Sequence, residues 1–273
     1  MWPFLYLTSM NQAVFIFKKY TPKNFRFFLR RLRRTFLYTA QSISGLKFKK
    51  KYHCPVNDKN YRTFIKDGLL LLSLDLGARE RHRFIWHYLK NHTILFRQNK
   101  ISLLHISPEF CFYEKLKEKK NIHYFPVDKF EPGYDYQSLT ENFDLLNENP
   151  EPEQYDFIIC NHVLEHITDD KTAIENLYKL LKYGGNAIVS VPILPNNAPT
   201  YEDYSITSPK ERKKHFGQWD HVRYYGTDIS ERFKKAGFDL KTINSLDYFN
   251  ESEREKFGIP DESWLFHLTK PPK

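Results

Sequence analysis

The stretch that decides the fold is YDFIICNHVLEHITDDKTAIENLYKLLKYGGNAIVSVPI, residues 155–193. Residues 155–160 and 187–191 are short apolar runs, which are typical of buried strands. Between them, residues 170–181 carry apolar side chains at helical spacing. Residues 182–185 include two glycines, which end helices by adopting left-handed backbone geometry. Strand, helix, turn and strand in this order predict one unit of a parallel α/β sheet.

The same alternation continues on both sides of this stretch. Apolar runs and helical spacings predict strand 101–106, helix 109–119, strand 121–127, and two closing strands at 238–243 and 264–269. In open α/β sheets, ligands bind beyond the carboxyl ends of the strands. The loops that follow these strands are therefore the expected site.

Residues 155–193 resemble the second half of class I S-adenosylmethionine-dependent methyltransferases, with a Leu-Glu-His string at 164–166, an acidic helix start and a Gly-Gly turn. The resemblance to type 11 methyltransferases runs from about residue 100 to the end. A subgroup often encoded near glycosyltransferases is similar from about residue 52. The resemblance implies an α/β fold, a Rossmann-like seven-stranded sheet with helices on both faces, and S-adenosylmethionine as cofactor.

The resemblance also implies which residues hold the cofactor. The loop after the first strand would approach the methionine part, and Asp128 would accept hydrogen bonds from the ribose hydroxyls. This loop lacks Gly-x-Gly, but the subgroup carries a His-x-x-Pro-Glu version of it. Glu109 is equally well explained as a charge at a helix N-terminus. The expected cofactor-binding residues are His105, Ile106, Ser107, Glu109, Asp128, Ser138, Leu139, Asn161 and His162.

An irregular insertion at residues 192–229 interrupts the α/β pattern, and such insertions are usually lids or binding loops. Methyl transfer to a hydroxyl requires removal of a proton, for which a histidine is suited. We expect His221 to be the base, Asp220 to orient it, and Arg223 to bind an acidic or phosphate-bearing substrate. A histidine that only holds the lid shut is the alternative. Glu165 and His166 are expected to orient their loop.

The N-terminal extension, residues 1–51, is basic. The first 53 residues contain twelve Lys or Arg and no acidic residue, whereas the remainder has a net charge of −3. This asymmetry weighs against a nucleic-acid enzyme, whose basic surface lies near its active site. Residues 24–37 place Phe25, Phe28, Leu29, Leu32 and Phe36 on one helical face and arginines around it. The pattern suits an anionic membrane surface or a helix docked on the parent domain.

Residues 52–98 resemble a degenerate zinc ribbon followed by a helix, and the main domain is assigned to 99–273. Cys54 survives from the first knuckle of the subgroup, but Asn57, Ser73 and Leu76 stand at the other three cysteine positions. One thiolate cannot form a four-ligand zinc site, so we expect no metal. The three separated cysteines fit a reducing cytoplasm.

The sequence thus predicts an O-methyltransferase that acts on a hydroxyl of a glycan or glycan precursor. Two alternatives remain open: methylation of a lipid-linked or isoprenoid small molecule, and a non-catalytic scaffold with a degenerate methyltransferase fold. We expect a cytoplasmic location, with the extension at the inner membrane surface as a further expectation.

Overall fold

The computed structural model describes residues 23–44, 52–67, 70–98, 100–130, 140–147 and 150–273. Its centre is a seven-stranded sheet in the order β12-β13-β9-β8-β5-β6-β7. The strands are β5 (Ile101–Ile106), β6 (Ile122–Asp128), β7 (Glu141–Asn142), β8 (Tyr155–Asn161), β9 (Leu181–Ser190), β12 (Asp239–Asn244) and β13 (Trp264–Thr269). β13 is antiparallel to both neighbours, while the pairs from β9 to β7 are parallel. The predicted Rossmann-like seven-stranded sheet is confirmed.

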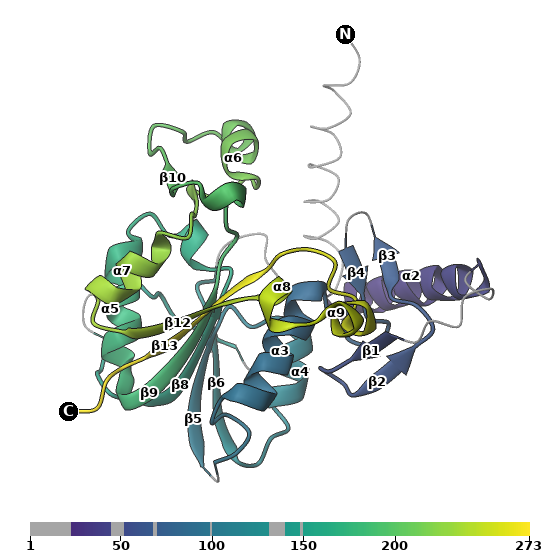
Figure 1. Cartoon of the computed structure of the whole chain (residues 1–273), viewed down its shortest axis with the longest axis horizontal. Coiled ribbons are helices and arrows are strands. Elements are labelled where there is room, and N and C mark those ends of the chain that lie inside the picture. The colour runs from purple at the N-terminus through teal and green to yellow at the C-terminus, as the bar shows by residue number, and fades with distance from the viewer. Residues whose placement is uncertain (1–22, 45–51, 68–69, 99, 131–139, 148–149) are drawn as a thin grey trace.

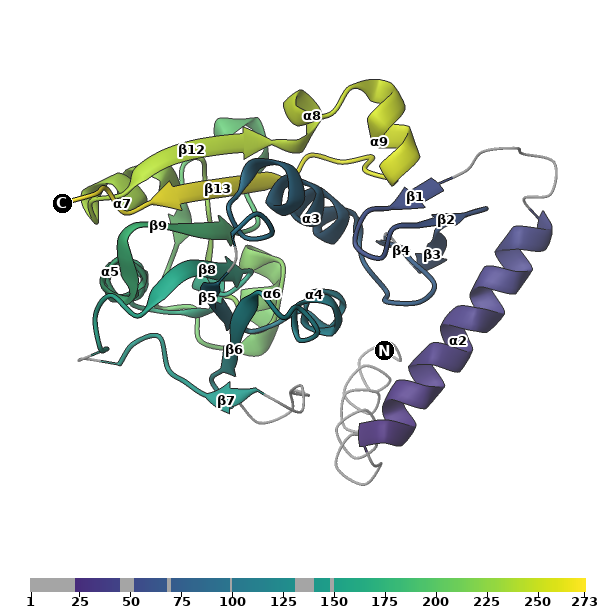
Figure 2. The same cartoon turned by 90° about the horizontal axis from the view of Figure 1, so that it is seen from below.

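Helices cover both faces of this sheet (Figures 1 and 2). On one face α3 (Glu80–His92) and α4 (Phe110–Leu116) pack against alternate strand residues. On the other, α5 (Asp170–Leu180) and α7 (Ile229–Lys235) pack against the intervening ones. Side chains alternate between the faces of a strand, so β8 contributes Phe157 to the first core and Ile158 to the second.

The turn expected at residues 182–185 is instead part of a strand. β9 begins at Leu181, directly after α5, and its pairing with β8 is irregular between Tyr155 and Phe157. Gly184 has a positive φ of 75° there. The two glycines therefore form a bulge at the start of β9, because the chain joins the sheet as soon as the helix ends.

Two small hairpins stand where a zinc ribbon was considered: β1 (Tyr52–Cys54) with β2 (Lys59–Tyr61), and β3 (Ile65–Asp67) with β4 (Leu70–Leu72). Fully buried Arg83 of α3 joins this region to the C-terminal segment. Its guanidinium donates to the carbonyl oxygens of Leu71, Ala78, Phe257 and Gly258, and lies 3.9 Å from the Phe64 ring centre. The hairpins and α3 share one core with the main sheet.

The long helix α2 (Lys23–Ser44) lies along the hairpin β3–β4 (Figure 2). Arg33 forms a bidentate ion pair with Asp67 at 2.8 Å, and Gln41 exchanges two hydrogen bonds with the backbone of Lys66. The predicted helix thus docks through polar side chains. Among the helices of the described ranges, none has both the length and the apolar character that crossing a bilayer requires.

The insertion 192–229 forms a cap at the carboxyl end of the sheet (Figure 1). It contains β10 (Tyr201–Glu202), α6 (Pro209–Phe216) and β11 (Arg223–Tyr224), and β10 pairs with β11. Of the last two short helices, α8 (Ser245–Tyr248) contacts β12 and α9 (Glu251–Phe257) contacts β1. The cap therefore stands over the strand ends where a ligand is expected.

Candidate functional site

Two residues with left-handed backbones lie at the carboxyl ends of β5 and β8. Ser107 follows β5 with φ of 51°, and His162 follows β8 with φ of 54°. Such conformations cost a non-glycine residue on the order of 1 kcal/mol or more, and they concentrate at ligand sites. Ser107 N–H donates to Val127 O at 2.8 Å, and His162 N–H donates to Ser190 O at 2.7 Å. The neighbouring strands thereby fix both loops.

Glu109 is held by the strand residue His105. The Nε2–H of fully buried His105 donates to Glu109 Oε2 at 3.0 Å, while its Nδ1 is hydrogen-bonded to the Tyr124 hydroxyl at 2.9 Å. Burial alone would raise the pKa of Glu109, but the hydrogen bond from His105 lowers it to about 2. Glu109 Oε1 is buried and has no hydrogen-bond partner among the described residues. An ionised oxygen is therefore available to a cationic group.

Arg81 brings a positive charge close to Glu109. Both residues line a cavity of about 580 Å³ between α2, α4 and the start of α3. Arg81 Nε is buried and likewise finds no hydrogen-bond partner in the described part of the chain. Burial, and then the neighbouring Arg79, lower the pKa of Arg81. The pair offers one acceptor and one donor, which is what an amino-acid head group with an ammonium and a carboxylate requires.

The remaining expected cofactor residues lie at neighbouring strand ends. Asp128 ends β6, beside β5, and is partly exposed. Asn161 ends β8, is buried, and accepts a 2.9 Å hydrogen bond from Ser190 Oγ on its Oδ1. Its Nδ2 has no partner among the described residues. Ile106 is buried at the end of β5, and Ser138 and Leu139 lie outside the described residues.

A second cavity of about 260 Å³ lies on the cap side of the same edge. Arg81 and His162 line it together with residues after β9, Tyr224 of β11 and the segment before β13. Arg81 therefore borders both cavities. The first cavity thus lies beside Glu109, and the second lies beside His162 and Tyr224.

Beside His162, the 3-10 turn η2 (Leu164–His166) meets the cap. His162 Nδ1 is 3.1 Å from Glu165 Oε1, and His166 Nδ1 is 3.3 Å from Asp220 Oδ2. The rings of His166 and His221 meet edge to face at 4.7 Å. The Nδ1–H of His221 donates to Phe216 O at 3.0 Å. The orienting role expected of Asp220 thus falls to a backbone carbonyl, because Asp220 pairs with His166.

These histidines have opposite electrostatic environments. Burial lowers the pKa of His221, and nearby His166 lowers it further. Burial would also lower the pKa of His166, but the hydrogen bond that His166 donates to Asp220 and the charge of Glu165 outweigh it and raise that pKa. His221 is therefore the more readily neutral of the two, with a lone pair on Nε2.

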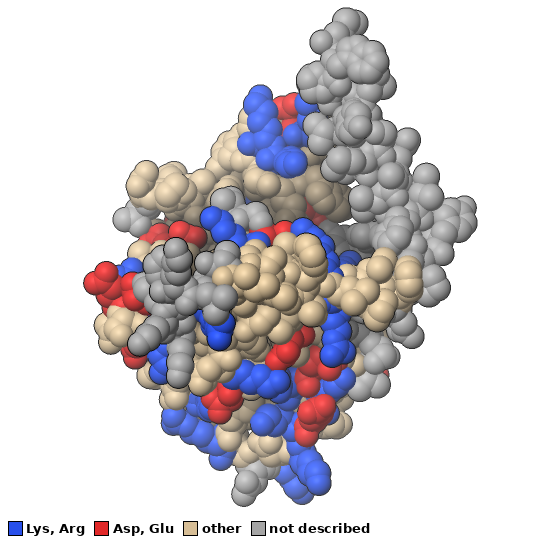
Figure 3. All heavy atoms as spheres, turned by 90° about the vertical axis from the view of Figure 1, so that its right-hand side faces the viewer, with Lys and Arg blue, Asp and Glu red and all other residues tan. Residues whose placement is uncertain are grey.

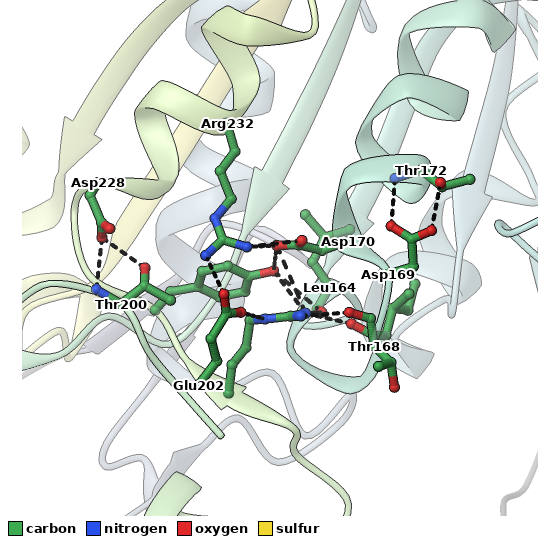
Figure 4. A network of polar contacts seen from close by, with 12 residues as sticks. Leu164, Thr168, Asp169, Asp170, Thr172, Thr200, Glu202, Asp228 and Arg232 are labelled. Carbon is green, nitrogen blue, oxygen red and sulfur yellow. Dashed lines mark hydrogen bonds and ion pairs between the residues drawn. The ribbon is translucent and has the colours of Figure 1, made fainter. Parts of the chain in front are cut away.

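Arg223 does not lie where a substrate-binding residue should. Its side chain is fully buried, and it donates to Glu202, to the Tyr204 hydroxyl and to the carbonyl oxygens of Leu164, Ile167 and Thr168. Figure 4 shows Arg232 bridging Asp170 and Glu202 in the same network. These contacts give Arg223 a structural role in place of the expected substrate contact: it fastens the cap to the turn η2.

The sequence assigned no site role to Arg81, and gave Glu165 and His166 only a positioning role. The string Glu-Arg-His-Arg at 80–83 begins the helix expected after the degenerate ribbon, and all four of its residues prove to be partly or fully buried. An arginine on the inner side of a helix start is the signal that could have pointed to Arg81. For Glu165 and His166, the corresponding signal in the sequence is the Leu-Glu-His string at 164–166.

Comparisons with known proteins identify the family and the fold. A family model described as a methyltransferase domain matches residues 74–243. The [4+2]-cyclase SpnF has a TM-score of 0.50 at 12% identity, with 77% of this chain and 87% of that chain covered. Phosphoethanolamine N-methyltransferase 2 of Haemonchus contortus, in complex with S-adenosyl-L-methionine, has a TM-score of 0.47 at 15% identity, with 69% and 52% covered.

The 1,6-didemethyltoxoflavin-N1-methyltransferase of Burkholderia thailandensis has a TM-score of 0.42 at 13% identity, with 63% of this chain and 72% of that chain covered. This chain spans about half the length of the Haemonchus contortus protein. At 12% identity, the likeness to SpnF shows the fold alone. Among curated proteins, none matches this chain.

Proposed function

The chain belongs to the methyltransferase-domain family, whose cofactor is S-adenosylmethionine, and we propose that it transfers the methyl group to a hydroxyl of a glycan or glycan precursor. The observation that carries the cofactor assignment is the pair of unsatisfied atoms at the carboxyl edge, Glu109 Oε1 and Arg81 Nε. S-adenosylmethionine supplies an electrophilic methyl group on sulfonium and carries an ammonium and a carboxylate. Glu109 would hold the ammonium and Arg81 the carboxylate.

The other residues of this edge serve the nucleoside and the methyl group. Asp128 would accept hydrogen bonds from the ribose hydroxyls, as an acidic residue does at this place in dinucleotide folds. Asn161 Nδ2, which is buried without a partner among the described residues, is a donor for the cofactor. His162 lines the cavity on the cap side and would border the methyl-transfer site.

Acceptor activation is assigned to the cap side. The cavity on the cap side would take the acceptor, and Tyr224, which lines it, offers a ring against which a sugar face can stack. His221, neutral through burial, would assist removal of the acceptor proton as the oxygen attacks the methyl carbon. Positioning of that oxygen in line with the methyl group would supply most of the rate.

The cofactor assignment is tested by calorimetric titration with S-adenosylhomocysteine, using the full chain and Asp128→Ala. We expect saturable binding by the wild type and a loss of about ten- to a hundredfold in affinity for the variant, since each charge-assisted hydrogen bond contributes about 1.5–3 kcal/mol. No binding by folded wild-type protein would overturn the assignment and favour the scaffold alternative.

The acceptor class is tested by label transfer from methyl-labelled S-adenosylmethionine into extracts, followed by partition between water and organic solvent. Label in the aqueous phase that acid hydrolysis converts to O-methyl sugar supports the glycan. Label in the organic phase that carries no sugar would replace it with the isoprenoid alternative.

We further propose that α2 lies on an anionic membrane surface. Phe25, Phe28 and Leu32 are each about half exposed and Phe36 is 72% exposed, whereas the opposite side of the helix docks on the hairpin β3–β4. An exposed apolar stripe of this kind marks an interaction surface. The basic surplus lies in this extension, while basic and acidic side chains are interspersed over the lower body on the face in Figure 3. An anionic lipid surface complements both properties.

A further inference from the structure

Three donor side chains converge where η2 meets the cap. Glu165, His166 and His221 each present one ligand atom, and these atoms lie within 4.8 Å of one another. Two imidazoles and one carboxylate are a ligand set typical of divalent transition metals. The sequence predicted no metal because the zinc knuckles are lost, but this cluster is unrelated to those knuckles. It joins two segments that are far apart in the chain.

Both histidines are oriented as metal ligands are. A metal-bound histidine usually donates its other ring N–H to a carboxylate or a backbone carbonyl. His166 has Asp220 at its Nδ1 at 3.3 Å, and His221 has Phe216 O at its Nδ1 at 3.0 Å. Each therefore keeps Nε2 for a ligand.

The carboxylate supplies an independent observation. The Glu165 side chain is only 1% exposed; its Oε1 is paired with His162, but Oε2 is buried with no hydrogen-bond partner among the described residues. An unsatisfied ionised oxygen in the interior costs several kcal/mol unless it is compensated. A cation between Oε2 and the two Nε2 atoms would compensate it.

The three ligand atoms would have to move only slightly closer together to bind one ion. Metal–ligand bonds of about 2.1 Å in tetrahedral coordination separate ligand atoms by about 3.4 Å. Side-chain rotations can close the remaining gap, and the backbone hydrogen bond from Val222 N–H to Glu165 O at 2.9 Å already holds the two segments together. His166 is 30% exposed, so one side of the cluster is open.

We propose that Glu165, His166 and His221 bind one divalent transition-metal ion, with the open side available to an oxygen of the acceptor. This rests on the proposed function and specifies how His221 would assist: it would act as a metal ligand and not as the proton acceptor, since a hydroxyl bound to the ion loses its proton to solvent more readily. The oxygen then bonds to the methyl carbon, and the carbon–sulfur bond breaks with its electron pair remaining on sulfur.

The test is a titration of tag-free, chelator-treated full-length protein with Co²⁺, whose visible absorption reports coordination, followed by competition with Zn²⁺. The variants are His166→Ala, His221→Ala and the isosteric Glu165→Gln. The matched control is His215→Ala, since His215 lies one residue before Phe216 in the sequence and contacts Tyr201 and Glu211. Thermal melts identify any variant that fails to fold.

We expect one equivalent of Co²⁺, displaced by Zn²⁺, and at least a tenfold loss of affinity in the folded variants of the three ligands but not in His215→Ala. Absence of stoichiometric binding, or unchanged binding in the ligand variants, would overturn the proposal. Binding of S-adenosylhomocysteine is measured on the same metal-free protein. Cofactor binding without metal binding would overturn only the metal site. Metal binding without cofactor binding would overturn only the proposed function.

Discussion

The backbone N–H of Val222 donates a 2.9 Å hydrogen bond to the carbonyl oxygen of Glu165. This bond places the cap loop that carries His221 against the turn that carries Glu165 and His166. Arg223, the next residue, binds three carbonyl oxygens of the same turn region. The chemistry proposed for the acceptor side therefore depends on how firmly the cap is fastened to η2.

Replacement of Arg81 should weaken binding of the amino-acid part of the cofactor and leave binding of the nucleoside part unchanged. Arg81→Ala is expected to weaken S-adenosylhomocysteine binding by about ten- to a hundredfold, because one charge-assisted hydrogen bond contributes about 1.5–3 kcal/mol. Binding of 5′-methylthioadenosine, which lacks the amino-acid part, should be unchanged. Calorimetry measures both, with replacement of the exposed Lys90 of α3 by alanine as control. Equal weakening of both ligands would show that Arg81 does not contact the amino-acid end.

Replacement of Arg223 should destabilise the whole domain. Arg223→Ala removes the buried guanidinium from Glu202 and from three carbonyl oxygens, and we expect a loss of about 3–5 kcal/mol in the free energy of unfolding. Tyr204→Phe removes one hydroxyl from the same network and should cost about 1 kcal/mol. Urea denaturation measures both. A stable Arg223→Ala protein that has lost only substrate affinity would restore the substrate-binding role.

Stability in acid should report the state of Glu109. The pKa of Glu109 is lowered from 4.5 in the unfolded chain to about 2 in the fold. The ionised carboxylate therefore stabilises the folded state fully at pH values above about 4.5. This contribution is lost as the pH falls from about 4.5 to 2. Urea midpoints across this range should fall less steeply in Glu109→Gln than in the wild type. Glu114→Gln, which removes a surface ion pair with Lys117, should follow the wild-type slope. Parallel curves for Glu109→Gln and wild type would contradict the buried pair with His105.

Vesicle sedimentation tests the membrane surface assigned to α2. The double variant Phe28→Asp and Phe36→Asp should bind vesicles containing phosphatidylglycerol at least tenfold more weakly than wild type, because each exposed aromatic ring buries apolar area worth about 1.5–3 kcal/mol when fully inserted. Binding should also fall in salt and with neutral vesicles. Phe130→Asp adds a charge at another exposed phenylalanine and serves as control. Equal binding by the double variant and wild type would overturn the proposal.

The alternation of buried runs and helical spacings was enough to predict the strands 101–106 and 264–269 with their observed limits. It also predicted α5 to within one residue. Hydrophobic periodicity is a local property that each segment carries alone, which is why it can be read without the fold. The helix α2 was predicted on the same basis, but the sequence could not say which of its faces would dock.

Tertiary structure alone decided the roles of the charged residues. Arg223 was expected to bind substrate from the insertion 192–229, yet its partners Glu202, Leu164 and Thr168 come from other elements and bury it completely. Arg81 and Glu109, on different helices, acquire a joint role only because the fold brings both to one cavity. The sequence determined the sheet because burial pattern is local. The function of a charge is not local, because it depends on the partners and the solvent that long-range packing gives it.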